Sequence, residues 1–180
     1  MARGSGQGRG RGAGRGFRQL GGGRGGQGGR GRPFTYNRAP PVLNPNPSPQ
    51  LLTAYIKNSR AVEALLKVTS LHESKMNHIH LSACFNNLGR LASREGEGWQ
   101  KQHWEALEKL ERHAQETVEK SKEIRARELA NISHGLAKSG LGLKMGDLMG
   151  ALGKALKKRA EDCNSQEIAN VAWAFAKAER

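Results

Sequence analysis

Acidic residues are missing from the first 62 residues of this 180-residue chain, which contain eleven Lys or Arg and neither Asp nor Glu. This segment therefore carries +11 of the formal net charge of +14, and the rest of the chain carries only +3. A basic arm attached to a nearly balanced domain is typical of proteins with an anionic partner, most often a nucleic acid.

Cysteines and long apolar runs are also scarce, which excludes several classes of protein. The two cysteines, Cys84 and Cys163, are too few for a disulfide framework and agree with a reducing compartment. No run of 18 or more apolar residues is present, so we expect no membrane span, and the start lacks the apolar segment of a secretory signal peptide. It also lacks the amphipathic helix of a transit peptide, which leaves the nucleus and the cytoplasm as possible compartments.

Signatures of enzyme chemistry are missing as well. The GxGxxG-like runs near the start follow no apolar strand and precede no helix, so they do not predict a dinucleotide site. The sequence shows no phosphate-binding loop, no familiar Ser/His/Asp order and no convergent pair of carboxylates. His72, His78, His80 and Cys84 fit no familiar zinc spacing. We therefore expect a protein that is not an enzyme, without a cofactor, a metal or a small-molecule substrate.

Residues 1–37 form an arm rich in arginine and glycine, with six Arg-Gly steps. Ordering so much glycine is entropically costly and no apolar face compensates for it, so we expect the arm to be disordered. Arginine supplies phosphate contacts and stacks on bases, which gives salt-dependent binding with little sequence preference. A solubilising or condensate-forming tail is the alternative. The candidate RNA-binding residues of the arm are Arg3, Arg9, Arg11, Arg15, Arg18, Arg24, Arg30 and Arg32.

Residues 38–50, RAPPVLNPNPSPQ, contain five of the six prolines of the chain. This composition predicts a stiff linker. Ordered structure is expected to begin near Leu51 and to continue over residues 51–180.

Three segments of that region resemble one another. IRARELANISHGLAKSG at 124–140 aligns with NSQEIANVAWAFAKAER at 164–180 in the register that places Leu129 39 residues before Ile168, and with MNHIHLSACFNNLGRLA at 76–92 after a shift of 48. Such periods predict stacked supersecondary units. An apolar-periodic partner helix precedes each copy, and the longer first spacing places an insertion near SREGEGWQK. We therefore predict an all-α fold, an α-solenoid of about three helix-turn-helix repeats over 51–93, 98–140 and 144–180.

Helical periodicity assigns two lines of each copy to packing. One line is apolar and is expected to be buried, and the other holds two small residues seven apart that let a neighbouring helix approach closely. The buried line comprises Leu81, Cys84, Phe85 and Leu88, then Leu129, Ile132, Ser133 and Leu136, then Ile168, Val171, Ala172 and Phe175; the small pairs are Ser82 and Gly89, Ala130 and Ala137, and Ala169 and Ala176.

A third line of each copy is polar or aromatic and ends in a cation, as a reader of one base per repeat requires. For the asparagines, the alternative to base contact is a hydrogen bond between repeats, and for the tryptophan the alternative to base stacking is a place in the core. The cations either contact phosphate or lie on a solvated face. The candidate residues of this edge are Asn86 and Arg90, then Asn131, His134 and Lys138, then Asn170, Trp173 and Lys177.

Residues at the helix ends give further expectations. Asn77 and Asn164 are suited to cap the first and third motif helices, and Asn164 has the spacing of a capping box with Glu167. Arg125 stands at this place in the second copy and leaves that boundary open. The glycines at 146, 150 and 153 either weaken the third partner helix or mark a close helix contact.

The units resemble those of octotricopeptide-repeat proteins and of the related arrays in RAP-domain and FAST-kinase-domain proteins. The resemblance covers roughly residues 51–180 and rests on QEIANVAWAFAKAE and RELANISHGLAKSG. The segment MNHIHLSACFNNLGRLA is similar to the unit that often opens such arrays in algal and other protist proteins. No RAP domain follows Arg180, and His134 stands where the pattern prefers Trp, so we expect a fragment or a short member.

The resemblance implies an RNA-binding α-solenoid that acts in a mitochondrion or plastid, in RNA processing, stability, translation or ribosome assembly. Its partners would be single-stranded RNA and proteins of ribonucleoprotein or ribosome-assembly complexes. Because helical repeats also bind peptides, the alternative is a protein-interaction scaffold of such a complex, with the arm giving non-specific RNA binding. A regulatory subunit of a nuclease or ribosome-assembly particle is a further alternative.

Overall fold

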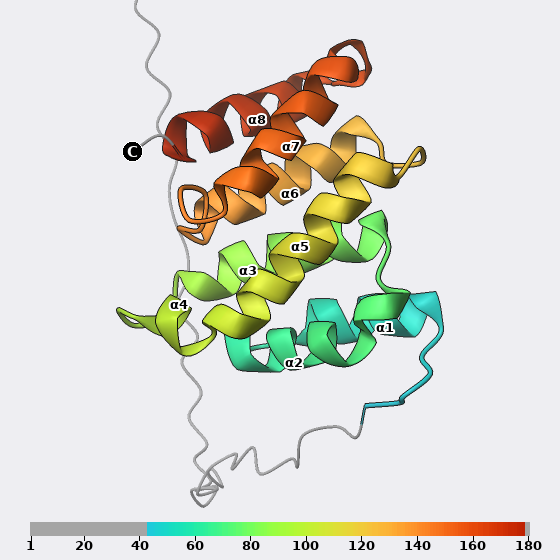
Figure 1. Cartoon of the computed structure of the whole chain (residues 1–180), viewed down its shortest axis with the longest axis vertical. Helices are drawn as coiled ribbons and strands as arrows, with labels where there is room; N and C mark the ends of the chain where they lie inside the picture. The colour runs from blue at the N-terminus through green and yellow to red at the C-terminus, as the bar shows by residue number, and fades with distance from the viewer. Residues whose placement is uncertain (1–42, 179–180) are drawn as a thin grey trace, which may run out of the picture. The chain divides into compact units, whose positions relative to one another are not determined.

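The computed structural model describes residues 43–178, and within this range it contains helices and turns but no β-strand (Figure 1). The predicted arm at 1–37, with its eight candidate arginines, lies outside the described residues, as do 38–42 of the predicted linker and residues 179 and 180. The elements are α1 (Pro49–Asn58), α2 (Val62–His72), η1 (Glu73–Lys75), α3 (His78–Ala92), α4 (Trp99–Gln102), α5 (Trp104–Lys120), α6 (Ala126–Lys138), α7 (Gly146–Lys158), η2 (Ala160–Asp162) and α8 (Ser165–Ala178).

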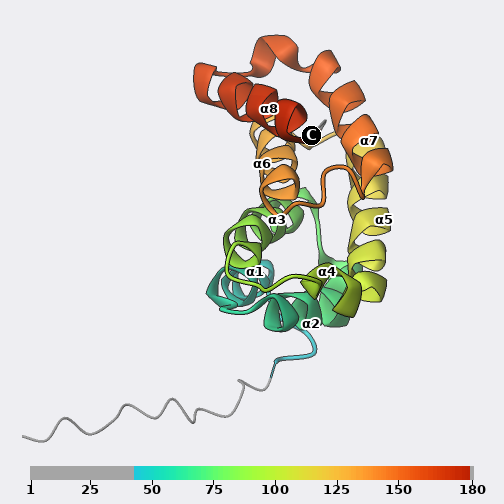
Figure 2. The ribbon, with the colours of Figure 1, turned by 90° about the vertical axis from the view of Figure 1, so that its left-hand side faces the viewer.

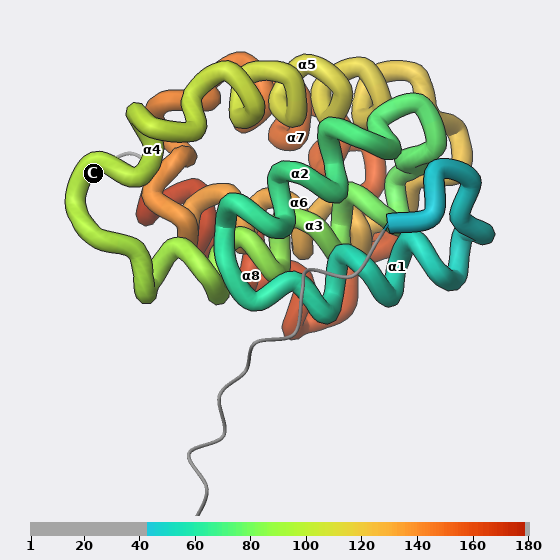
Figure 3. The backbone as a smooth tube through the Cα atoms, turned by 90° about the horizontal axis from the view of Figure 1, so that it is seen from below, coloured from blue at the N-terminus to red at the C-terminus, as the bar shows by residue number. Residues whose placement is uncertain are grey.

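The helices of this range form two layers (Figures 2 and 3). In the first layer α1, α3, α6 and α8 pack on one another in that order, and in the second layer α2, α5 and α7 do the same. The chain alternates between the layers, with the short α4 packed against α5. Helices of one layer are therefore each separated in sequence by a helix of the other, as the predicted pairing of a partner helix with a motif helix requires.

The core lies between the layers, and most of the predicted apolar positions are in it. The second-layer side chains Leu65, Leu107 and Leu148 are fully buried. In the first layer the buried line of the first two copies is buried as predicted, at Leu81, Cys84, Phe85, Leu88, Leu129, Ile132, Ser133 and Leu136.

The ordered region begins earlier than predicted. Helix α1 starts at Pro49, two residues before the predicted boundary, because the Ser48 hydroxyl accepts a hydrogen bond from the Leu51 amide at 3.2 Å. The preceding turn is also attached to the helices, since Lys75 Nζ donates to the Pro45 carbonyl at 2.8 Å. Leu43 packs against the core. The last residues of the predicted linker therefore belong to the helical region.

The predicted caps are present at both asparagines. The Asn77 side chain accepts from the amides of Ile79 and His80, and Asn164 and Glu167 form a reciprocal capping box with bonds of 3.0 and 2.9 Å. In the second copy α6 begins at Ala126, where the Glu128 carboxylate accepts from the Arg125 amide. Each of these bonds satisfies a backbone group at a helix start.

Two glycines bring α3 and α6 together at short range. A Cβ at Gly135 would lie 2.2 Å from the Phe85 carbonyl oxygen, and one at Gly89 would lie 2.9 Å from the Gly135 oxygen. A side chain at either position would force the backbones apart. In α7, by contrast, a Cβ at Gly146 or Gly150 would meet nothing within 4 Å, so neither marks a close helix contact.

The predicted burial is wrong for part of the last copy. Ile168 is 55% exposed and Ala172 is exposed, while Val171 and Phe175 are half-buried. Ala169 and Ala176, which were expected to permit close stacking, are exposed too. Their counterparts in α3 and α6 are covered by the next helix of the layer, and among the described residues no helix covers this face of α8. Only Ala174, the counterpart of Gly135, is fully buried there against α6.

Candidate nucleic-acid interface

The residues of the predicted edge lie on the first layer, on the side of α3, α6 and α8 opposite their buried lines. Asn86, Arg90, Lys138 and Lys177 are exposed, and Trp173 is 44% exposed. Asn131, His134 and Asn170 are half-buried. Since these three helices are successive members of one layer, corresponding positions lie on one continuous surface.

His134 and Trp173 are brought together by this arrangement. Their ring centroids are 4.9 Å apart and the ring planes are inclined by 41°, so that the two rings form an aromatic pair across α6 and α8. Burial lowers the pKa of His134, and Lys138, one turn further along α6, lowers it more. At neutral pH the imidazole is therefore uncharged and offers an aromatic face beside the indole.

The two asparagines of the edge have different surroundings. Asn131 donates from its amide nitrogen to the Ser82 hydroxyl at 3.2 Å. A hydrogen bond between helices of successive copies was the alternative to base contact for the asparagines. For Asn170 the residue in the place of Ser82 is Ala130, which has no side-chain acceptor. No hydrogen bond of the Asn170 amide is found within 43–178, so its donor and acceptor are available for a ligand.

The cations of the edge sit in the last turns of their helices, with Lys57 of α1 in the same place. Arg90 is held in position, because its guanidinium donates to the Asn87 side chain at 2.5 Å and to the Ser59 carbonyl at 3.5 Å. Lys138 and Lys177 make no ion pair with the described residues. Their ammonium groups are therefore free to contact an anion.

Acidic residues of the first-layer helices are confined to the opposite ends of those helices. Glu128 and Glu167 are the only two within α1, α3, α6 and α8, and each accepts a backbone amide at its own helix start. The same helices contain five cations, at Lys57, Arg90, Arg127, Lys138 and Lys177. The C-terminal halves of the first-layer helices thus carry positive charge alone.

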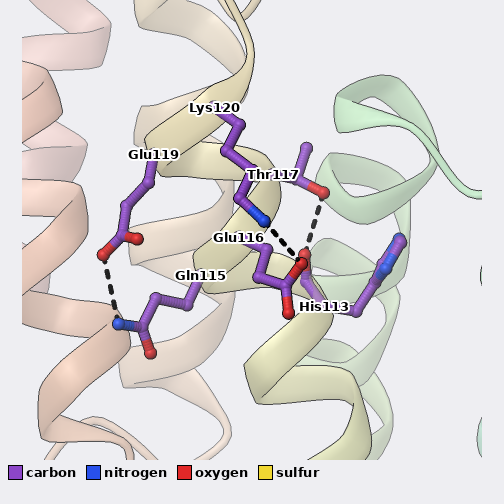
Figure 4. A network of polar contacts seen from close by, with 6 residues as sticks. All are labelled: His113, Gln115, Glu116, Thr117, Glu119 and Lys120. Carbon is purple, nitrogen blue, oxygen red and sulfur yellow. Dashed lines mark hydrogen bonds and ion pairs between the residues drawn. The ribbon is translucent and has the colours of Figure 1, made fainter.

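Helix α5, the longest helix of the second layer, is different. Figure 4 shows side-chain contacts within α5, which include Lys120 with Glu116 at 3.0 Å and Gln115 with Glu119 at 3.1 Å. Lys109 pairs with Glu105 at 2.8 Å in the same way. An anion approaching α5 would meet carboxylates beside every lysine, whereas on the first layer it would not.

Sequence reasoning missed some cations of the first layer. Lys57 and Arg60 were counted with the basic arm, but Lys57 lies in α1 and Arg60 directly after it. Arg127 lies one heptad before His134 and is exposed, but its counterparts Ile79 and Gln166 are uncharged, so the repeat alignment gave no signal.

Two other features of the same range bear on the kind of site. Groups of three or more His, Cys, Asp or Glu side chains that could bind a metal ion are not found among residues 43–178. None of the described helices is long and apolar enough to cross a membrane.

No protein-family model matches the chain, and neither a curated protein nor a solved structure matches it. The resemblance to octotricopeptide-repeat proteins therefore rests on the motif residues of the sequence.

Proposed function

We propose that the helical region is an α-solenoid of three repeats, α2 with α3, α5 with α6 and α7 with α8, that binds single-stranded RNA along its first layer. The bases would lie over Asn86, the His134 and Trp173 pair, and the free amide of Asn170. The phosphates would lie over the cations at the helix C-termini. In this proposal the protein is not an enzyme, and the Arg-Gly arm adds affinity that does not depend on sequence.

One observation carries the proposal, namely the charge distribution of the first layer. Its helices combine an aromatic pair with a line of cations, and their only two carboxylates are used as caps at the far ends. Single-stranded nucleic acid is bound by this combination of stacking side chains and an unopposed basic surface. A cationic or neutral partner would not require that the carboxylates be kept away, and an acidic peptide would not require the aromatic pair.

The resemblance of the motifs adds the cellular setting to this proposal. It favours a mitochondrion or plastid as the compartment, and organellar RNA processing, stability, translation or ribosome assembly as the process. Ribonucleoprotein or ribosome-assembly proteins would be the protein partners.

Paired lysine substitutions on the two layers test the proposal. Lys138→Ala with Lys177→Ala removes two exposed cations of the first layer, and Lys109→Ala with Lys120→Ala removes two of α5. Titration of a labelled single-stranded RNA at several salt concentrations measures the affinity and its salt dependence. Because each phosphate contact contributes about 0.7 to the salt slope on a single strand, the first-layer variant should lose about 1.4.

The α5 variant is the matched control and should bind like the unchanged protein. Circular dichroism of both variants should be unchanged, since all four side chains are exposed helix residues. Equal losses in the two variants would contradict binding along the first layer. Unchanged binding in both would restrict any RNA affinity to other parts of the chain.

A protein-interaction scaffold is a second candidate, favoured by the exposed apolar face of α8. Ile168, Ala169, Ala172 and Ala176 lie on this face uncovered by described residues. If residues 43–180 yield no crosslinked RNA while the full chain does, the scaffold reading is supported and the arm alone binds RNA.

A further inference from the structure

A hollow of about 430 Å³ lies where α1 and α3 end. It is lined by Lys57, Asn58, Ser59, Arg60, Arg90 and Arg94. Its volume is within the range of small-ligand sites, about 300 to 1,000 Å³. Four of the six lining residues are cations and none is a carboxylate. Glu95 and Glu97 follow Arg94 in the chain, but they are exposed and do not line the hollow.

Attraction of cations to helix C-termini does not account for this cluster. Each helix C-terminus carries about −0.5 of an elementary charge. The ends of α1 and α3 together therefore offset about one positive charge, whereas Lys57, Arg90 and Arg94 alone supply three. A surplus of about two charges remains around the hollow when Arg60 is left out of the count.

The backbone carbonyls at these ends are also supplied with other donors. At the end of α1, Asn87 Nδ2 donates to the carbonyls of Ile56 at 2.7 Å and Ser59 at 3.1 Å. At the end of α3, the Ser93 hydroxyl donates to the Arg90 carbonyl and the Arg94 amide donates to Leu91. Lys57 and Arg94 are thus not needed to satisfy the helix ends, and neither forms an ion pair with a described residue.

Arg90 gives the hollow a cation whose position is fixed by hydrogen bonds. Its guanidinium is fixed by Asn87 and Ser59, which are themselves buried. A positioned guanidinium flanked by exposed cations matches the planar, two-point recognition of a phosphate group.

We propose that the hollow lined by Lys57, Arg60, Arg90 and Arg94 binds a phosphate group of single-stranded RNA. The inference rests on the proposed function and extends it beyond the predicted edge, since of these residues only Arg90 belongs to that edge. It places a phosphate contact on α1, at the end of the first layer remote from α8.

The test uses the full chain with Lys57→Ala and Arg94→Ala combined, and leaves Arg90 in place because its bonds support Ser59 and Asn87. The matched control is Lys154→Ala with Lys158→Ala in α7. These two lysines line a hollow of similar size, about 390 Å³, that also contains Glu119 and Asp162. Both variants are titrated with a labelled single-stranded RNA over a range of salt, and separately with inorganic pyrophosphate.

The Lys57 and Arg94 variant should bind RNA about fivefold to tenfold more weakly at low salt, and its salt slope should fall by about 0.7, the contribution of one phosphate contact. The α7 control should not change. If Lys57→Ala with Arg94→Ala binds RNA like the unchanged protein while the Lys138 and Lys177 variant is weakened, the hollow is not an RNA site and the proposed function stands.

A different result separates the failure of the proposed function itself. If no form binds RNA but pyrophosphate binds the unchanged protein and not the Lys57 and Arg94 variant, the hollow is a phosphate site and the RNA assignment is overturned. If neither probe distinguishes the variant from the control, the whole inference is wrong.

Discussion

His72 is a buried polar residue without a hydrogen bond. It ends α2, is 1% exposed, and neither of its ring nitrogens has a partner among the described residues. Its ring stacks on Tyr55 with centroids 6.3 Å apart and planes inclined by 24°. Burial lowers its pKa, and Lys75 lowers the pKa further. The ring face of His72 therefore packs on Tyr55, while its two unpaired nitrogens lower the free energy of unfolding, because burying polar atoms without hydrogen bonds is unfavourable.

Replacing His72 by Phe should stabilise the protein at neutral pH. The change keeps a ring on Tyr55 and removes two unsatisfied polar atoms, for which a gain of about 1 kcal/mol in the free energy of unfolding is expected. The variant should also resist acid better. Because the folded-state pKa of His72 lies below 6.5, the unfolded chain binds more protons, and stability falls as the pH drops from about 6.5 toward the lowered value.

Urea unfolding at pH 7.5 and pH 5.5 measures both effects. The acid loss should be smaller in the variant but not absent, because the pKa of His134 is lowered by burial as well. Ile79→Phe, at an exposed position on α3, changes no titratable group and should keep the full acid loss of the unchanged protein. An acid loss in His72→Phe as steep as in the unchanged protein would show that His72 does not titrate with unfolding.

At the scale of helices, the contact of α3 with α6 depends on the absence of side chains. Gly135 lies against the Phe85 carbonyl and Gly89 lies against Gly135, so that backbone meets backbone. The corresponding contact of α6 with α8 has Ala174 in the place of Gly135. The layer thus tolerates a methyl group at one contact and excludes it at the other.

Gly135→Ala should destabilise the protein by about 3 kcal/mol or more, because backbone atoms cannot move aside as a side chain does. Gly150→Ala is the matched control, since it is the same change in a helix with nothing within 4 Å of the new methyl group. It should stabilise α7 by about 1 kcal/mol through helix propensity. Thermal unfolding of both variants checks the prediction, and a stabilised Gly135→Ala would refute the close contact.

The sequence predicted the positions of these helices, and it predicted their buried faces where another helix packs on the apolar side. The alignment of three copies located α3, α6 and α8, and the apolar periodicity of the partner segments located α2, α5 and α7. The prediction of burial failed for Ile168, because helical periodicity only identifies the most apolar face of a helix. Burial also requires a second surface that packs on this face. Prediction also failed for the start of α1, where proline was read as a linker signal although proline suits the first turn of a helix.

For the whole molecule, the sequence gives the net charge but does not give the positions of all the cations in the fold. Periodicity found Arg90, Lys138 and Lys177, because a cation recurs at that position. It had no means of finding the hollow of Lys57, Arg60 and Arg94, since Lys57 and Arg60 follow one another at the end of α1 while Arg94 is brought to them only by the packing of α1 on α3. The hydrogen bond of Asn131 likewise depends on the packing of α3 on α6, which places the Ser82 hydroxyl within reach of the Asn131 amide.

The division of work between the arm and the helices is tested by removing residues 1–42. The cut preserves Leu43, which packs on the core, and Ser48, which caps α1, so helicity by circular dichroism should be retained. It removes nine arginines and no carboxylate and leaves a formal net charge of +5. If every arginine of the arm contacts phosphate, the salt slope of RNA binding falls by up to about 6.

Replacement of the same nine arginines by lysine provides the control that separates charge from stacking. The net charge is unchanged, so the salt slope should be kept, while the affinity at high salt should fall because lysine lacks the planar group that stacks on bases. The truncated chain should retain a shallower slope, contributed by the cations of the first layer. If truncation alters neither affinity nor slope, the arm takes no part in RNA binding and the first layer must account for all of it.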